Sequence, residues 1–413
     1  KLAELSDATL VLGSATPSLE AYSRAQNGNY HFYKLTKRLT GGSLPRVEIA
    51  DLRQELRNGN RSIFSMSLQE KLRDRLARKE QSMLFLNRRG YAGFVSCRAC
   101  GYVCKCPHCD VSLSEHRGGR LVCHYCGYEQ PAVKLCPSCG SKYILGFRAG
   151  TEAMEEQLHK MFPQARVLRM DADTTRTRES YEKILAAFAR GDADILVGTQ
   201  MIVKGHDFPA VTLVGVLNAD AALYLDDFRA GERTFSMLTQ VIGRAGRAAK
   251  RGVAVIQTMN PNHEVIRLAA AQDYRAFYAR DIKLREAFTF PPFCDIAVIS
   301  AASASEAACT KCAAEIFTFM KDKMSGDYRD VPVISFGPFE APLYKIEDDG
   351  SKTLEPNPTI QIIGRPDTEV VTTGKLKISK KDVTKLTNRA AALLELFLHG
   401  FMQERKEMEA AQE

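Results

Sequence analysis

Four Cys-x-x-Cys pairs lie close together in one short stretch and constrain the fold more than any other feature of the sequence. The pairs are Cys97/Cys100, Cys106/Cys109, Cys123/Cys126 and Cys136/Cys139. A two-residue spacer lets both sulfurs of a pair point at one ion about 2.3 Å away. Because no secretory leader is visible at the start of the sequence, zinc thiolates fit these pairs better than disulfides. The sequence therefore predicts two zinc ions, each held by four cysteines.

The segment between the second and third pairs indicates which pairs share an ion. It consists of two short apolar-polar stretches around Gly118-Gly119, which is typical of the hairpin of a zinc ribbon. Such a hairpin would bring Cys106, Cys109, Cys123 and Cys126 together and leave Cys97, Cys100, Cys136 and Cys139 for the other ion. Spacing alone leaves a sequential pairing open. Four sulfurs fill a tetrahedral site, so we expect structural rather than catalytic zinc.

Length and composition set the remaining limits. A chain of 413 residues favours two or three domains, and 45% hydrophobic with 26% charged residues is a globular composition. No apolar run is long enough to span a bilayer, so we expect a soluble, cytoplasmic protein without membrane contact. The net charge of 57 − 49 = +8 is compatible with a polyanionic partner but decides nothing. The chain begins with Lys1 rather than Met, which suggests a fragment.

Apolar runs alternate with helical patterns on both sides of the cysteines. We expect strands at residues 82–87, 166–170, 194–198, 211–217 and 252–257. We expect a helix that starts at a capping box in residues 67–70, one at 152–162 capped by Thr151, and one at 178–190 that stops at Gly191. This alternation predicts a parallel sheet covered on both faces, with the cysteine module inserted between a strand and its following helix.

Two loops of this α/β pattern carry polar groups that suit phosphate contacts, and we expect both at the carboxyl ends of strands. Residues 198–209 offer Thr199, Gln200 and Lys204 after a buried strand. In residues 240–247, Gln240, Arg244 and Arg247 follow helical spacing, which would place them on one face. Guanidinium groups presented together suit a polyphosphate, although any one of them is more often a solvated surface charge.

Together these segments closely resemble bacterial primosomal protein N′, the PriA family of replication-restart helicases of superfamily 2. The resemblance rests on the eight cysteines and on residues 13–20 (GSATPSLE), 85–91 (FLNRRGY), 198–209 (GTQMIVKGHDFP), 226–230 (DDFRA) and 240–247 (QVIGRAGR). It extends in order and spacing from about residue 8 to about residue 300. It implies a RecA-like helicase lobe and the nested cysteine pairing.

The resemblance also implies roles for individual residues. Ser14, Ala15 and Thr16 would be helicase motif III, which couples the nucleotide state to the grip on DNA. Motif V would supply Thr199, Gln200, Lys204 and Gly205, and motif VI would supply Gln240, Arg244 and Arg247. By this likeness Arg244 and Arg247 reach the γ-phosphate and stabilise the charge that develops during phosphoryl transfer.

The expected function is therefore that of an ATP-dependent 3′→5′ DNA helicase of replication restart, active at stalled or branched forks and at junctions of single strands with duplex. The sequence has neither a Walker loop nor an Asp-Glu-x-His segment, so ATP and Mg²⁺ would need a first lobe. We expect this fragment to bind DNA and zinc without hydrolysing ATP. Single-strand DNA-binding protein and other primosome proteins would be partners. The alternative is a non-catalytic zinc-ribbon adaptor that binds branched DNA.

The expected domain order has five parts. Residues 1–22 would end the first helicase lobe, 23–96 would link to and begin the second, 97–140 would form the zinc module, 141–288 would complete the second lobe, and 289–413 would form an α+β domain. In this last domain we expect strands near 296–300, 331–336 and 359–364 and helices at 305–323 and 381–408. The basic run 375–381 suits DNA or a solvated loop, and residues 348–358 depart from the family pattern.

Overall fold

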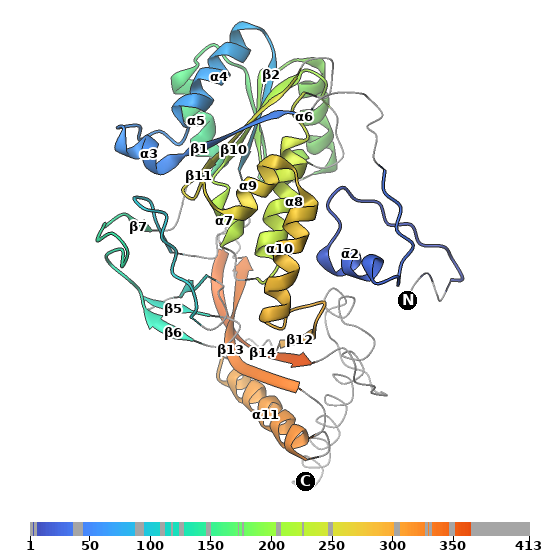
Figure 1. Ribbon diagram of the computed structural model, residues 1–413. Coiled ribbons are helices and arrows are strands. Elements are labelled where there is room, and N and C mark those ends of the chain that lie inside the picture. The colour runs from blue at the N-terminus through green and yellow to red at the C-terminus, as the bar shows by residue number, and fades with distance from the viewer. Residues whose placement is uncertain are drawn as a thin grey trace.

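The computed structural model is built around a six-stranded parallel sheet (Figure 1). Its strands are β1 (Arg46–Asp51), β2 (Gln81–Leu86), β8 (Val167–Met170), β9 (Ile195–Gly198), β10 (Val211–Leu217) and β11 (Val253–Thr258). They lie in the order β1-β11-β10-β2-β9-β8, and every neighbouring pair is parallel. This confirms the predicted parallel sheet. The sequence analysis misses β1, an edge strand in which only Ala50 is buried.

The structure describes residues 3, 6–35, 44–86, 95–107, 112–116, 119–123, 128–145, 150–171, 173–175, 177–203, 208–224, 227–246, 251–300, 306–326, 329, 333–346 and 352–364. Residues outside these ranges include several predicted site residues, which are named below.

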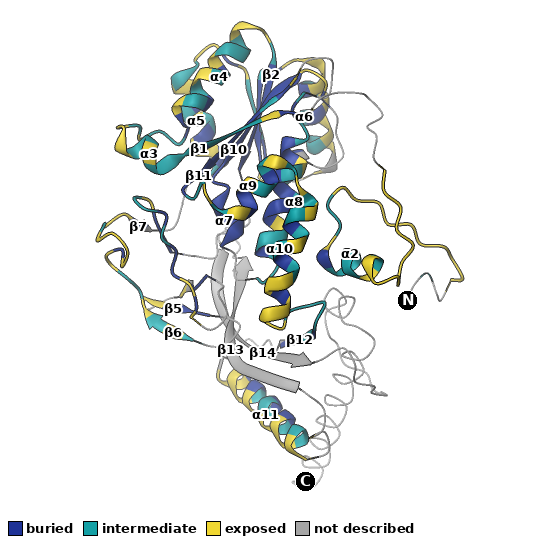
Figure 2. Ribbon diagram, in the orientation of Figure 1, coloured by how far each residue is buried: buried dark blue, intermediate teal, exposed yellow. Residues whose placement is uncertain are grey.

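Helices cover both faces of the sheet, so its four inner strands, β11, β10, β2 and β9, are almost entirely buried (Figure 2). One face carries α4 (Met66–Ala77) and α5 (Thr151–Met161). The other carries α6 (Arg178–Arg190), α8 (Ala230–Ile242), α9 (Glu264–Ala271) and α10 (Tyr274–Ala287). Short elements are α2 (Leu19–Gln26), α3 (Leu52–Arg57), α7 (Asp220–Leu223) and the 3-10 helix η1 (Gln200–Val203).

Alternation along each strand divides the apolar side chains between the two faces. In β2, Met83 and Phe85 join the core under α6 and α8, whereas Leu84 and Leu86 join the core under α4 and α5. Successive side chains of a strand point to opposite faces, so a strand covered on both sides must be apolar throughout. The continuous apolar run that predicts β2 follows from this double burial.

Two predicted helix caps are wrong, and one helix end is confirmed. The N-cap of α4 is Ser65, whose side chain accepts from the backbone N–H of Leu68; Ser67 lies inside the helix and does not open a capping box. Thr151 does not cap α5, because its hydroxyl donates to Asp171 Oδ2 at 2.5 Å instead. Gly191 ends α6 with a left-handed φ of 84°, as its sequence predicts.

The cysteine module lies between β2 and α5, as predicted. It contains β3 (Ser96–Cys97), β4 (Ser114–His116), β5 (Arg120–Val122), β6 (Glu129–Pro131) and β7 (Ile144–Leu145). Ser114 pairs with Val122 in the antiparallel β4–β5 hairpin, which confirms the predicted ribbon hairpin. The third strand, β6, pairs with β5 and extends it.

The C-terminal part of the described chain is α+β. An antiparallel sheet in the order β12-β14-β13 comprises β12 (Asp295–Ser300), β14 (Lys352–Gly364) and β13 (Val333–Ile346), accompanied by α11 (Glu306–Ser325). β13 and β14 are much longer than the strands expected at 331–336 and 359–364, and β14 includes residues 352–358 of the segment that departs from the family pattern. The helix expected at 381–408 and the run 375–381 lie outside the described residues. No described helix is long and apolar enough to cross a bilayer.

Candidate metal centre and coupling site

Four cysteine sulfurs converge at the base of the cysteine module. The Sγ atoms of Cys97, Cys100, Cys136 and Cys139 all lie within 4.8 Å of one another. Cys97 Sγ is 3.7 Å from Cys139 Sγ, and Cys100 Sγ is 3.5 Å from Cys136 Sγ. A tetrahedral site with zinc–sulfur bonds of about 2.3 Å has edges of about 3.8 Å. The dimensions of the cluster therefore fit zinc. Its members are the first and fourth pairs, as a nested arrangement requires.

The backbone around each pair turns the two sulfurs toward one point. The N–H of Gly101 donates to the carbonyl of Cys97, and the N–H of Gly140 donates to the carbonyl of Cys136, each at 2.8 Å. Both glycines have a positive φ, 82° at Gly101 and 68° at Gly140. Each turn is closed where a side chain would be strained, which explains the glycine after each of these pairs.

The thiols of the cluster differ in acidity. Burial raises the pKa of Cys97 and Cys100. Burial acts in the same direction on Cys136, but hydrogen bonds from the backbone N–H groups of Ser138 and Cys139 outweigh it and lower its pKa to about 7. The Cys136 thiol therefore loses its proton near neutral pH. A cation bound here would have to displace the protons of the other thiols.

The second and third pairs are described only in part. Cys106 and Cys123 are buried beside the β4–β5 hairpin, whereas Cys109 and Cys126 lie outside the described residues. Cys104 is buried between these sets, and burial raises the pKa of its thiol to about 11. A thiol with this pKa stays protonated and is not one of the four clustered sulfurs.

The first Cys turn packs against the carboxyl-terminal edge of the central sheet. Asn260, just after β11, donates to the carbonyl of Gly101 at 3.2 Å. Arg53, at the start of α3, donates to the carbonyl of Cys100 at 3.2 Å and pairs with Asp51 at the end of β1. The cluster of four cysteines is thereby attached to the edge at which ligand-binding loops of α/β sheets lie.

A hydroxyl chain links two segments that are 220 residues apart. Thr16 Oγ1 lies 2.8 Å from Ser236 Oγ of α8, and Gln240 Nε2 donates to the same Ser236 oxygen at 3.0 Å. Ser14 Oγ accepts from the backbone N–H of Thr16 at 3.1 Å, and Tyr274 donates to the carbonyl of Pro17 at 2.8 Å. Thr16 and Gln240 thus share one contact through Ser236.

A buried charged group, here called the Arg285 cluster, lies beside this chain. Arg285 of α10 is 2% exposed; it donates to Glu20 Oε1 at 3.0 Å, to Glu232 and to the carbonyl of Pro291. Asp281 lies 3.8 Å away, and Arg229 pairs with the same Glu20 oxygen at 3.2 Å. Burial alone would raise the pKa of Glu20, but Arg285 and Arg229 outweigh it and hold that pKa below its usual value.

The remaining predicted residues are brought together only in part. Thr199 and Gln200 are half-buried at the carboxyl end of β9, where η1 begins. Lys204, Gly205 and Arg247 lie outside the described residues.

Two geometric expectations for residues 240–247 are wrong. α8 ends at Ile242 and the chain turns at Gly243, so Arg244 does not continue the helical face of Gln240. The segment also does not follow a carboxyl end of a strand, because the N–H of Gly246 donates to the carbonyl of Val211 at the start of β10.

Comparison with known proteins identifies the family. Residues 106–131 match the PriA DNA helicase Cys-rich region domain, and residues 139–249 match the helicase conserved C-terminal domain. The chain is 48% identical over 349 residues to replication restart protein PriA of Bacillus subtilis, covering 84% of this chain and 43% of the relative. The chain belongs to the PriA family. The PriA relative from Haemophilus influenzae is 37% identical over 346 residues, covering 83% of this chain and 46% of its own length.

This chain thus spans less than half the length of these two PriA relatives. The parallel sheet and the matched helicase domain confirm a RecA-like lobe with an inserted Cys-rich module. Among solved structures, RecG bound to a three-way DNA junction matches with a TM-score of 0.32 and 15% identity, covering 59% of this chain and 22% of RecG.

In this PriA-family chain, three residues that make the contacts between distant segments, Ser236, Arg285 and Glu20, are not predicted from the sequence. Ser236 is a polar position in an amphipathic helix, and Arg285 is one basic residue of a mixed helix, so neither carries a signal of its own. Glu20 lies inside the family segment 13–20 but receives no role there. What these residues have in common is contact between distant segments, which only the fold shows.

Proposed function

We propose that this chain contributes the second motor lobe and the metal module of an ATP-dependent 3′→5′ DNA helicase of replication restart. The observation that carries the proposal is the link from Thr16 through Ser236 to Gln240, the family's motifs III and VI. Next to it, Leu10, Val11 and Leu12 are 66%, 84% and 67% exposed and belong to no sheet of the described residues. Such an apolar stretch suits a strand of a first lobe, which would be joined to this one through Thr16.

Each motif residue has a proposed role. Arg244 and Arg247 would contact the γ-phosphate. Gln240, which contacts Thr16 through Ser236, would link movement of Thr16 to these arginines. Ser14, Thr16, Thr199, Gln200, Lys204 and Gly205 would couple the nucleotide to DNA. ATP and Mg²⁺ would be held mainly by first-lobe residues, because this sequence lacks a Walker loop.

For the metal module we propose two structural zinc ions in nested pairing. The sulfur spacings of Cys97, Cys100, Cys136 and Cys139 support the first ion. Cys106, Cys109, Cys123 and Cys126 would hold the second, at the hairpin that the structure describes only in part. A zinc ion supplies a four-way cross-link to the loops around it, and all-sulfur coordination leaves no position for substrate.

We propose forked DNA and junctions of single strands with duplex as the substrate, on the basis of the resemblance to replication-restart helicases. Single-strand DNA-binding protein and other primosome proteins would be partners, and the location would be cytoplasmic. The five-part domain division given above belongs to the same proposal.

The decisive test compares two polypeptides. Residues 1–413 should bind forked DNA without ATP turnover, whereas a polypeptide that also carries a first lobe should hydrolyse ATP when DNA is added. In the longer polypeptide, Arg247→Ala should lower turnover by about 10³-fold and leave DNA binding near normal. Robust ATP hydrolysis by residues 1–413 would refute this assignment, and DNA binding without turnover by the longer polypeptide would favour the adaptor.

A further inference from the structure

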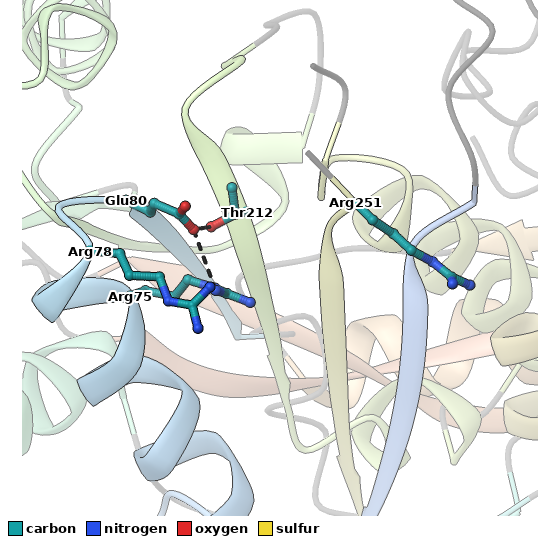
Figure 3. A pocket seen from close by; sticks show the side chains of 5 residues that line it. All are labelled: Arg75, Arg78, Glu80, Thr212 and Arg251. Atoms are coloured by element: carbon teal, nitrogen blue, oxygen red, sulfur yellow. Dashed lines mark hydrogen bonds and ion pairs between the residues drawn. The ribbon is translucent and has the colours of Figure 1, made fainter. Parts of the chain in front are cut away.

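An open cleft lies at the amino-terminal edge of the central sheet, opposite the edge that holds the metal module (Figure 3). Its volume is about 580 Å³, and five residues line it: Arg75, Arg78, Glu80, Thr212 and Arg251. Arg75 is in the last turn of α4, Arg78 follows that helix, and Arg251 lies two residues before β11. The residues come from three distant parts of the sequence, so the fold alone assembles the cleft.

The inner part of the cleft is a fixed polar contact. Thr212 donates to Glu80 Oε2 at 2.6 Å, and Arg75 Nη1 lies 3.4 Å from the same oxygen. The side chains of Arg75 and Glu80 are only 11% and 10% exposed. Because these partners restrain each other, this part of the cleft has little freedom to move.

The other two arginines are oriented through their inner nitrogens. Arg78 Nε donates to Asp74 at 2.9 Å, and Arg251 Nε donates to the carbonyl of Leu44 at 3.3 Å. Among the described residues, no further hydrogen bond is made by the terminal Nη groups of either side chain. The outer fork of each guanidinium therefore faces solvent, in the geometry that binds two oxygens of a phosphate.

The residues that line the cleft indicate what kind of ligand it binds. The lining contains three guanidinium groups and one carboxylate, and none of its five residues is apolar. Asp74, which pairs with both Arg75 and Arg78, is a second carboxylate beside the lining, so basic groups exceed acidic ones by one. Sites for small organic molecules are mostly apolar and enclosed, whereas contacts to nucleic-acid backbones are open and rich in arginine. The cleft lies on the α4 side of the sheet and borders the segment that carries Arg244, because the N–H of Gly246 donates to the carbonyl of Val211, the residue before Thr212.

We propose that this cleft binds the phosphate backbone of DNA through residues that belong to none of the motor motifs. The inference rests on the DNA binding of the proposed function and adds a site to it. Arg78 and Arg251 make the phosphate contacts, and Arg75 with Glu80 keeps the inner part of the cleft rigid.

The test measures the binding of a fluorescent duplex to residues 1–413 by anisotropy at several salt concentrations. The variant Arg78→Gln/Arg251→Gln should bind about 10-fold more weakly, and its dependence of log K on log salt should become shallower by roughly 1 to 2. The matched control is Arg267→Gln/Arg275→Gln, which removes the same charge from exposed positions on α9 and α10. It should change neither quantity, and thermal unfolding should show that both variants fold.

Each outcome bears on the proposal. Equal affinity and equal salt dependence of the cleft variant and wild type would overturn the cleft while leaving the proposed function intact. An equal loss in the control would mean that only net charge matters, which also overturns it. Calorimetry with inorganic phosphate distinguishes a DNA phosphate from a free phosphate ion as the ligand. If the cleft variant loses phosphate binding but keeps its DNA binding, the cleft is a site for a free anion and the DNA proposal is overturned. Failure of wild type to bind DNA would overturn both proposals.

Discussion

At the scale of single residues, the Arg285 cluster shows how charge can be buried between helices. Arg285, Arg229 and Arg280 face Glu20, Glu232 and Asp281, so basic and acidic groups are equal in number. Burial raises the pKa of Glu232 and Asp281 in spite of Arg285, while the two arginines keep the pKa of Glu20 low. Arg285 thus provides the positive charge that offsets the burial of three carboxyl groups.

Removing that arginine should be costly. We expect Arg285→Met to lower the free energy of unfolding by about 3–5 kcal/mol, because it leaves buried carboxylates without their cation. Lys283→Met, an exposed position on the same helix, is the control and should have little effect. Urea denaturation of both variants measures the difference, and equal midpoints would show that the cluster contributes nothing.

A second residue-scale prediction concerns Asp171. Burial would raise the pKa of Asp171, but the Thr151 hydroxyl and backbone N–H groups outweigh it and hold the pKa below its usual value. A lowered native pKa gives stability that is complete above the unfolded pKa, about 3.9, and is lost as pH falls through the native value.

Thr151→Val removes the hydroxyl and should cost about 1–2 kcal/mol at neutral pH. It should also move acid unfolding, followed by circular dichroism, to a higher pH than in the wild type. Thr9→Val changes an exposed threonine and is the control. An acid transition at the wild-type pH would show that Thr151 does not set the ionisation of Asp171.

At the scale of elements, the first Cys turn is the joint between module and lobe. A Cβ added at Gly101 would lie 2.5 Å from Asn260 Oδ1 and 2.7 Å from the carbonyl oxygen of Met259. Gly140 has a similar positive φ in the fourth pair, but a Cβ there would meet nothing within 4 Å. A side chain would therefore strain the backbone at both glycines, but only at Gly101 would it also clash with neighbouring atoms.

This difference makes a matched experiment. Gly140→Ala should cost about 1–2 kcal/mol through its left-handed backbone alone. Gly101→Ala should cost on the order of 1–3 kcal/mol more, because it also forces the module away from β11. Thermal unfolding of both variants measures the extra term, and equal destabilisation would mean that the module is not packed against Asn260.

At the scale of the whole molecule, the sheet and the cysteine module are stabilised differently. The sheet is covered by two extensive apolar cores, whereas cysteines dominate the small core of the module, with Leu113, Leu121 and Ile144. A core of this kind buries little hydrocarbon, so its stability must come largely from cross-links.

We therefore expect loss of zinc to unfold the module and spare the lobe. Cys136→Ser should lower the zinc content from about two to about one per chain, whereas Cys312→Ser in α11 should leave it unchanged. Acid should release the metal, since burial raises the pKa of Cys97 and Cys100 and protons compete for those sulfurs. Metal analysis with thiol alkylation tests this, and folded, metal-free protein with freely alkylated thiols would contradict the proposed centre.

The sequence by itself predicts what depends on short-range pattern. Paired cysteines, the hairpin around Gly118-Gly119, the helix end at Gly191 and five strands of the central sheet each depend on residues that are close together in the chain. The family resemblance likewise rests on short segments in a fixed order, which the comparisons confirm.

Only the tertiary structure decides what joins those segments. The contacts of Thr16 with Ser236, Glu20 with Arg285 and Glu80 with Thr212 connect residues more than 100 positions apart, and the pairing of Cys97 with Cys139 depends on everything folded between them. Likewise, the turn at Gly243 replaces the helical spacing expected for Arg244. Local pattern specifies an element, but the strand order sets which elements meet, and with it the partners of each polar side chain.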